Sequence, residues 1–202
     1  MTIETSWFTM DNKLGIDLNR IYTSVTATTN PAQPEYPGIP HTLGDRVQGN
    51  NGSEWVFVQA SATVTAYNAL AIDTNFKVQA LTSTLLASGT YTYGFAQFKP
   101  RGGVTAGSAS GGVANAGDFF WALVKVNHQA RLNVTASVSV AGGAALYISP
   151  SLPGFLTTSA TASRLNGLVI PVSASGGGDI TITEFGMFTY LTPAVNVSVL
   201  SV

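Results

Sequence analysis

The most regular stretch of the chain is an alternation of apolar and polar residues between Phe119 and Val140. Its even positions are apolar with the single exception of His128, whereas its odd positions turn polar from Lys125 onward. Successive side chains of a β-strand point to opposite faces of a sheet, so this period of two predicts a strand with one buried face. As one strand the stretch would span about 70 Å, which exceeds the usual length. We therefore expect a break or bend, placed at Asn127-His128-Gln129.

A second alternating stretch runs from Glu54 to Ala66 and begins in a similar way. The match between the two stretches is Trp55-Val56-Phe57-Val58-Gln59 with Trp121-Ala122-Leu123-Val124-Lys125. Two further matches are Ala69-Leu70-Ala71-Ile72 with Ala145-Leu146-Tyr147-Ile148, and Tyr93-Gly94-Phe95-Ala96 with Asn166-Gly167-Leu168-Val169. Internal similarity of this kind predicts a repeated structural unit. We therefore expect a duplicated β unit whose loops differ in length between the copies.

The remaining pattern predicts an all-β fold with four segments. Helix signals are almost absent, and turn residues separate short runs rich in Val, Thr and Tyr. We expect an extended N-terminal arm at 1–43, a first β unit at 44–100, a Gly-rich loop or linker at 101–117 and a second β unit at 118–202. The final valines, between Val195 and Val202, could form a closing strand on the parent sheet or a strand exchanged with a neighbour.

The predicted arm combines apolar side chains with repeated prolines. Four prolines between Pro31 and Pro40 exclude a continuous helix or a central strand there. One interpretation is a flexible terminus. The other is a segment that docks on a neighbouring subunit or partner, because a tail meant only for solvent would carry more charge. The arm residues expected to make such contacts are Trp7, Phe8, Ile16, Tyr22 and Tyr36.

Charge is unusually scarce in this chain. Asp, Glu, Lys and Arg make up 9% of its 202 residues, against about 25% in ordinary soluble domains. Either uncharged polar side chains hydrate the surface or other subunits cover much of it, and we favour the second explanation. The net charge of −1 and the lack of a basic cluster argue against nucleic acid as a partner.

The same composition bounds localisation and chemistry. No apolar run approaches the roughly 20 residues that span a bilayer. The segment from Met1 to Lys13 lacks the basic region and the apolar region of a secretory signal. We therefore expect neither membrane association nor export by a cleaved leader. Cysteine is absent, which removes disulfides, thiol catalysis and Cys-ligated zinc.

Candidate catalytic and metal-binding residues are sparse. His41 and His128 are the only histidines, they are far apart in sequence, and no cluster of acids accompanies either one. The serine elbow motif is missing, because Ala109 stands where its nucleophile would be. Asp179 and Glu184 lie on opposite faces of one predicted strand and so do not form a carboxylate pair. We expect no catalytic residues, no metal site and no cofactor.

Trp55 and Trp121 are the most informative single residues. Both stand at the start of an alternating stretch, on its less apolar face. One interpretation is that each indole closes a barrel end or packs beneath a loop. The other is that each serves as an aromatic anchor in an oligomer interface, where Trp is enriched.

Several of these segments resemble the decoration (cement) proteins of tailed bacteriophage heads. The similar segments in the first half are Gly44-Asp45-Arg46-Val47, Gly52 to Ala60, and Ala69 to Ile72. In the second half they are Gly117 to Val140, Gly143 to Ile148, Pro153-Gly154-Phe155-Leu156 and Asn166 to Val169. The likeness covers residues 43 to 175 and rests on glycine and β spacing rather than on catalytic motifs.

The resemblance implies a fold and a function. The expected fold is all-β, with duplicated small β-barrel or β-sandwich units that are β-tulip-like and carry an extended N-terminal arm. The expected function is that of a non-enzymatic virion protein, made in the host cytoplasm and located on the outer capsid surface. Such a protein is commonly a homotrimer whose partner is the major capsid protein.

A second hypothesis comes from a different class of protein. The chain could be a carbohydrate-binding module of a phage fibre or surface protein, with Trp55 or Trp121 as the stacking platform for a sugar. The two hypotheses differ in the exposure of these indoles, because a sugar site requires an exposed Trp in the isolated protein. A hydrolase of unknown type is a more distant third possibility.

Overall fold

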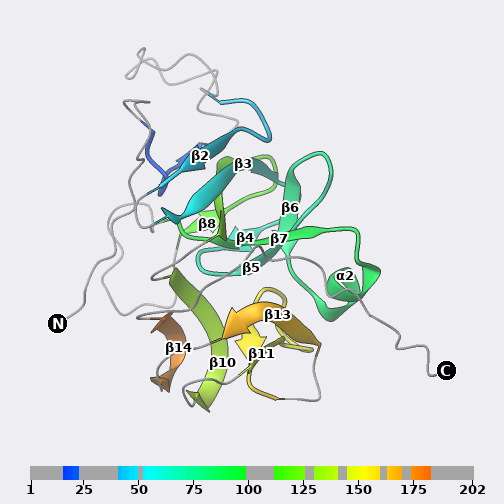
Figure 1. The fold of residues 1–202 in the computed structure, drawn as a ribbon, viewed down its shortest axis with the longest axis vertical. Helices are drawn as coiled ribbons and strands as arrows, with labels where there is room; N and C mark the ends of the chain where they lie inside the picture. Colours follow the sequence, from blue (N-terminus) through cyan, green and yellow to red (C-terminus); the bar gives the residue numbers. More distant parts are fainter. Residues whose placement is uncertain are drawn as a thin grey trace.

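A computed structural model describes residues 16–22, 41–49, 52–98, 112–125, 130–140, 145–159, 163–169 and 174–182. Its strands form one seven-stranded, one five-stranded and one two-stranded sheet. The helix among the described residues is the short α2 (Ser83–Ser88) (Figure 1). The predicted all-β class is therefore confirmed. Trp7, Phe8, Tyr36 and the final valines lie outside the described residues, and the predictions made for them stay predictions.

Five strands of the first half close into a small barrel. They are β3 (Glu54–Ala60), β5 (Ala69–Ile72), β6 (Lys77–Ala80), β7 (Thr92–Ala96) and β9 (Phe119–Lys125). The order β9-β7-β5-β6-β3 closes on itself because β9 also pairs with β3. The strands β1 (Ile21–Tyr22) and β2 (Arg46–Gln48) extend this sheet at its two ends.

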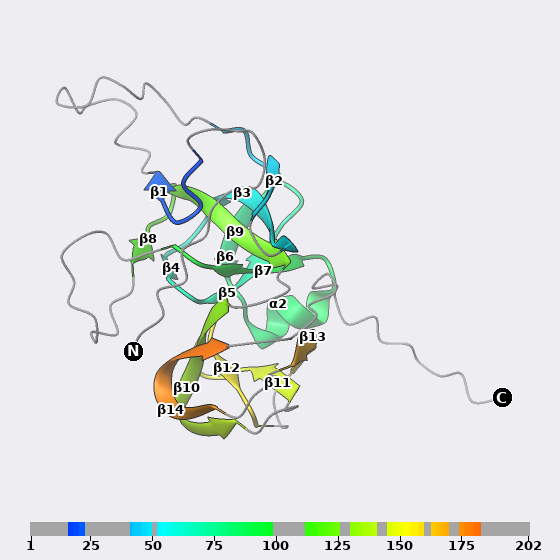
Figure 2. The same cartoon turned by 60° about the vertical axis from the view of Figure 1, so that its left-hand side comes forward.

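The second half forms a separate five-stranded sheet, below the barrel in the views of Figures 1 and 2. Its strands are β10 (Ala130–Val140), β11 (Ala145–Ile148), β12 (Leu156–Thr157), β13 (Arg164–Val169) and β14 (Ala174–Ile182), in the order β13-β11-β12-β10-β14. A third, two-stranded sheet pairs β4 (Val64–Thr65) with β8 (Val113–Ala114).

The predicted duplication is visible in the strand order. The series β7-β5-β6-β3 in the barrel has the same sequence of neighbours as β13-β11-β12-β10 in the second sheet. In each series one pair is parallel, β3 with β6 and β10 with β12, and the other pairs are antiparallel. Each series continues with an antiparallel strand: β9 pairs with β3, and β14 pairs with β10. The two sheets therefore share one strand topology, which agrees with the expected duplicated β unit.

The first part of the expected alignment is wrong. It matched β3 with β9, but the topology makes β3 equivalent to β10, whereas the matches of β5 with β11 and of β7 with β13 hold. The equivalent segments share residues at a constant offset of 76 positions: Ala60, Ser61, Val64, Ala69, Leu70 and Ile72 recur as Ala136, Ser137, Val140, Ala145, Leu146 and Ile148. The strands β3 and β9 look alike for another reason, because they are antiparallel neighbours with the same inner and outer faces.

The boundary between the two units also differs from the expected one. Strand β9 belongs to the barrel, and β8 lies inside the segment expected to be a linker, so the first unit continues to Lys125. The second unit begins with β10 at Ala130. The break expected at Asn127-His128-Gln129 falls on residues 126–129, which lie outside the described part of the chain, and the strands before and after them, β9 and β10, belong to different sheets.

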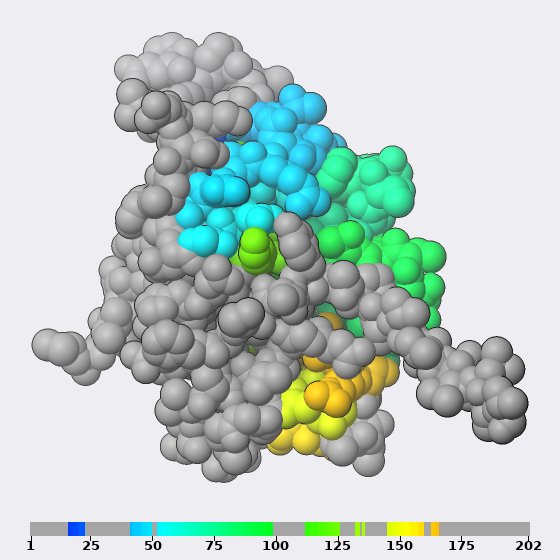
Figure 3. Space-filling view, in the orientation of Figure 1, coloured from blue at the N-terminus to red at the C-terminus, as the bar shows by residue number. Residues whose placement is uncertain are grey.

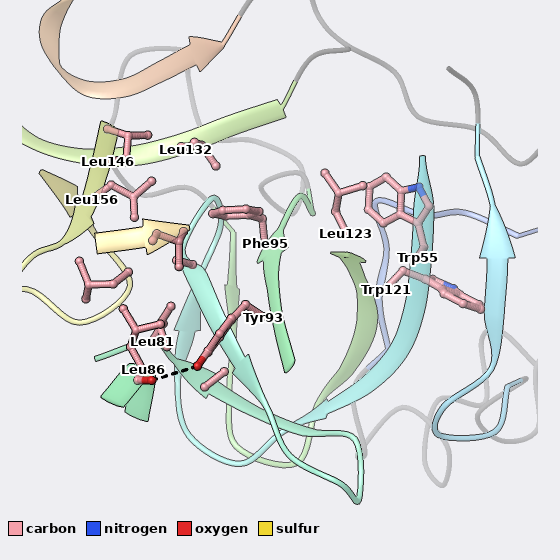
Figure 4. Close-up of a cluster of buried hydrophobic side chains, with 14 of the residues drawn as sticks. Trp55, Leu81, Leu86, Tyr93, Phe95, Trp121, Leu123, Leu132, Leu146 and Leu156 are labelled. Carbon is pink, nitrogen blue, oxygen red and sulfur yellow. Dashed lines mark hydrogen bonds between the residues drawn. The ribbon is translucent and has the colours of Figure 1, made fainter. Parts of the chain in front are cut away.

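Both faces of the barrel wall are buried, in two separate apolar clusters. The inner cluster fills the barrel with Val56, Val58, Leu70, Ile72, Val78, Phe120, Ala122 and Val124, among others. The outer cluster joins Trp55, Phe57, Tyr93, Phe95, Trp121 and Leu123 of the barrel to Leu132, Leu146, Ile148, Leu156 and Leu165 of the second unit (Figure 4). The expectation that only one face would be buried within the chain, the other being left for water or a partner, is therefore wrong for β3 and β9, because the second unit, α2 and N-terminal residues cover the outer face.

Candidate interaction site on the outer face of the barrel

Two N-terminal segments attach to the barrel by strand addition. Strand β1 pairs antiparallel with the start of β9, at the register Ile21 with Phe120 and Tyr22 with Phe119. Strand β2 pairs antiparallel with the start of β3. Each segment pairs with a part of a barrel strand that the neighbouring barrel strand leaves unpaired. On β9, for example, β7 pairs only with Ala122 and Leu123. Figure 2 shows β1 beside β9 and β2 beside β3.

An aromatic cluster lies where these segments meet the barrel. The His41 ring stands edge-on to Trp121 and Phe57, with centroid distances of 5.0 and 5.1 Å. The Tyr22 ring lies 5.8 Å from Phe57, and the Arg20 guanidinium lies 5.2 Å from the centre of the Tyr22 ring. Edge-on aromatic pairs contribute about 0.5 to 1.5 kcal/mol each beyond their burial. His41 is thus part of the contact that holds residues 41–49 on the barrel.

Four of the seven expected interface residues lie within the described part of the chain, and all four pack against the outer cluster. Ile16 and Tyr22 are partly buried there, beside the fully buried Leu18. Trp55 and Trp121 are themselves 0% and 1% exposed. No sequence pattern distinguishes Leu18 from the other apolar residues of the N-terminal segment, so its role could not be found in advance.

The burial of both indoles argues against Trp55 and Trp121 as exposed aromatic anchors or sugar platforms. Neither forms an exposed anchor or a sugar platform on the single chain, because residues of the N-terminal segments lie over this face of the barrel. The Trp55 Nε1 donates a hydrogen bond of 3.0 Å to Ser53 Oγ. The Trp121 Nε1 is buried and has no hydrogen-bond partner among the described residues. The interpretation of packing beneath a covering segment is the one that fits.

We expect weak quenching of these two tryptophans. In a Trp7→Phe variant the remaining fluorescence comes from Trp55 and Trp121, and acrylamide should quench it far less than in the urea-unfolded chain, because buried indoles are shielded from the quencher. Stern–Volmer titration of the folded and unfolded variant measures the difference. Equal quenching in the two states would contradict the burial described above.

A buried polar junction fixes the second unit to the barrel. Asn133 of β10 is 5% exposed, and its Nδ2 donates to Ala66 O at 2.8 Å and to Asn68 Oδ1 at 2.7 Å. Its backbone N donates to Tyr67 O at 3.0 Å. On the other side, Gly154 N donates to Leu81 O and Gly154 O accepts from Ala69 N, both at 2.8 Å. The turn at 66–69 is therefore held from both sides by the second unit.

Helix α2 covers another part of the outer cluster and is tied to the barrel through Tyr93. Thr82 caps the helix by accepting a hydrogen bond from Leu85 N, and Gly89 ends it with a φ of 67°. The buried Tyr93 hydroxyl donates to Leu86 O at 3.2 Å. Burial raises the pKa of this hydroxyl above its ordinary value, because the phenolate is poorly solvated there.

The raised pKa of Tyr93 predicts a loss of stability at alkaline pH. A group whose pKa is higher in the folded state than in the unfolded state contributes to stability. This contribution is complete below the unfolded pKa of 10.0 and is lost as the pH rises through the folded pKa. Tyr93→Phe should cost about 1 kcal/mol at neutral pH and should flatten the alkaline decline. Urea unfolding between pH 8 and 11 measures both effects, and parallel alkaline declines in the two proteins would contradict the assignment.

Several charged groups in the described residues serve local structure. Lys125 Nζ and Glu54 Oε1 form an ion pair of 3.0 Å across β9 and β3. Asp45, Asp73 and Asp118 accept backbone hydrogen bonds in turns. Within the described ranges, no group of three or more histidine or acidic side chains could hold a metal ion. None of the helical residues described there forms a segment long and apolar enough to cross a bilayer.

No protein-family model matches the chain, and no curated protein has significant sequence similarity to it.

Proposed function

We propose that this chain is a structural virion protein that binds the outer surface of an assembled phage capsid as a homotrimer. In this role it stabilises contacts between major capsid subunits and catalyses no reaction. The proposal starts from the resemblance of residues 43 to 175 to capsid decoration proteins.

The observation that most supports the proposal is the pair of small β units with added N-terminal strands. The resemblance rests on the spacing of short β segments, and the matched segments include the barrel strands β3 and β5 and the equivalent second-unit strands β10 and β11. Strands β1 and β2 further show that extended segments of this chain bind by backbone pairing. The low charge also fits a surface that partners cover.

The mechanism of stabilisation would be thermodynamic. A ligand that binds only the assembled lattice stabilises it by mass action, by about 2.7 kcal/mol per site at a concentration one hundred times its dissociation constant. Three linked sites in a trimer would add avidity, because the second and third contacts form at a high effective concentration. The capsid would therefore resist internal pressure without any chemical step.

Binding to shells tests the proposal. The full chain should co-sediment saturably with expanded shells of the encoding phage that lack it. A variant without residues 2–15 should bind at least about tenfold more weakly, a loss of about 1.4 kcal/mol, if the N-terminal segment contributes a clamp. Removal of all of 1–43 is unsuitable, because it also deletes the buried Leu18 and the β1 pairing.

The controls distinguish the test of capsid binding from the test of the N-terminal clamp. Thermal unfolding of the variant without 2–15 should match that of the full chain, so that weaker binding is not a folding defect. Equal binding by both proteins would contradict the clamp and leave the capsid role standing. Failure of the full chain to bind expanded shells would contradict the capsid role itself. Glycan screening would then test the carbohydrate hypothesis, for which the buried Trp55 and Trp121 supply no exposed platform.

A further inference from the structure

Tyr67 has a left-handed backbone conformation, which is unfavourable for a residue that carries a side chain. Its φ is 67°, and for residues other than glycine this conformation lowers the equilibrium constant of folding about tenfold. At the constant offset of 76 positions, the equivalent residue of the second unit is Gly143, and glycine adopts this conformation without that cost. The turn at 66–69 therefore carries a strain that a glycine would avoid.

The side chain of Tyr67 gives a reason for a tyrosine at this position. It is 7% exposed and belongs to the inner cluster, together with Leu70, Phe98 and Phe120. The Tyr67 backbone N donates to Ala96 O at 2.7 Å, where β7 ends. The ring is thus held at the end of the barrel at which β7 ends and β5 begins.

Asn133 of the second unit holds both peptide groups that flank the Tyr67 Cα. Its Nδ2 donates to Ala66 O at 2.8 Å, and its backbone N donates to Tyr67 O at 3.0 Å. A change of φ or ψ at Tyr67 would turn one of these carbonyl groups relative to the other, so Asn133 could not bind both. The barrel holds the amide groups instead, through Ala96 O for Tyr67 N and Gly112 O for Ala66 N. The second unit therefore helps to fix the strained conformation.

We propose that Tyr67 is a strained closure of the barrel end, which opens when the second unit moves away. While the second unit is docked, Asn133 holds Tyr67 in the left-handed conformation and its ring in the inner cluster. In the space-filling view of Figure 3, the described part of the second unit, in yellow and orange, lies against the green part of the barrel. When Asn133 withdraws, the strain favours a relaxed turn, and the ring leaves the barrel end.

This closure links the interior of the barrel to the position of the second unit. Asn133 is a positioning residue in it, since it acts through the backbone of Tyr67. The inference goes beyond the capsid role, because it concerns the isolated protein and can be tested without shells.

A double-mutant cycle tests the strain. Tyr67→Ala and Tyr67→Gly both remove the ring, and they differ in the cost of the left-handed conformation. Urea unfolding gives the ratio of their unfolding equilibrium constants, which should be about tenfold larger with Asn133 present than in the Asn133→Ala background, where the turn has already relaxed. The flexibility of the unfolded glycine chain affects both backgrounds equally. The same ratio in both backgrounds would overturn the proposal, since lost hydrogen bonds alone do not distinguish glycine from alanine.

Thiol labelling tests the opening with the tyrosine ring in place, and it remains decisive if Tyr67→Ala fails to fold. The chain has no cysteine, so an introduced thiol is the only one present. Ala66→Cys reports on the turn, and Ala122→Cys on β9 is the matched control, because both positions are buried in the inner cluster. Asn133→Ala should raise the ratio of the two labelling rates about tenfold, whereas a loss of global stability raises both rates equally. An unchanged ratio would overturn the proposal.

Discussion

Asn133→Ala is expected to lower the free energy of unfolding by about 3 kcal/mol, because it leaves two buried acceptors without a donor. The Asn133 Nδ2 is the donor to both Ala66 O and Asn68 Oδ1, and neither water nor another side chain readily replaces it when the site is 5% exposed. Asn133→Asp should cost more at neutral pH, since a carboxylate would face the same two acceptors. Urea unfolding followed by far-ultraviolet circular dichroism measures the loss.

The matched control for this variant is Thr135→Ala, on the same strand. Thr135 is only partly buried and should cost well under half as much as Asn133→Ala. Acid should partly rescue Asn133→Asp, because a protonated carboxyl can again donate one hydrogen bond. A cost for Asn133→Ala no larger than that of Thr135→Ala would show that the polar junction does not hold the two units together.

Gly154→Ala is expected to destabilise the protein by about 3 to 4 kcal/mol, through backbone strain and a steric clash. The glycine has a φ of 77°, and a Cβ there would lie 2.6 Å from Asn68 Cγ and 2.7 Å from Asn68 Nδ2. The Asn68 side chain cannot easily move away, because its Oδ1 accepts a hydrogen bond from Asn133. The shift in the urea midpoint, at an unchanged slope, measures the loss.

The Gly89→Ala variant separates the effect of backbone strain from that of the steric clash. Gly89 has a similar φ of 67° but no atom within 4 Å of the position that a Cβ would take. Its substitution should therefore cost only the strain of a left-handed residue, about 1 to 2 kcal/mol. Similar losses at Gly89 and Gly154 would mean that Asn68 does not confine the turn.

The sequence was sufficient to place most strands but not to pair them. Alternation located β3, β9 and β10, because the period of two is a local property of the backbone. It could not show that β3 and β9 are neighbours in one barrel. Two adjacent strands that each carry a tryptophan on the outer face and valine and alanine on the inner face resemble each other as closely as two copies of a duplicated strand do.

Four of the seven residues expected at an interface lie in the candidate site, and all four pack within the single chain. Ile16, Tyr22, Trp55 and Trp121 do come together, on one face of the barrel. Packing beneath a loop was one of the two interpretations of Trp55 and Trp121, but the covering segments could not be identified, because amphipathicity shows that a face needs covering and not which segment covers it. A signal was present in retrospect, since a face that carries Trp55 and Phe57 is too apolar to be left to water.

The shared outer cluster has a consequence for truncation of the chain. Each unit supplies part of the covering that the other requires, through residues such as Phe95 and Leu146. Removal of either unit would expose an aliphatic and aromatic surface, so we expect neither to be stable alone without new polar residues on that face. The two units should therefore unfold together, and insertions should be tolerated only at positions away from the face at which they meet.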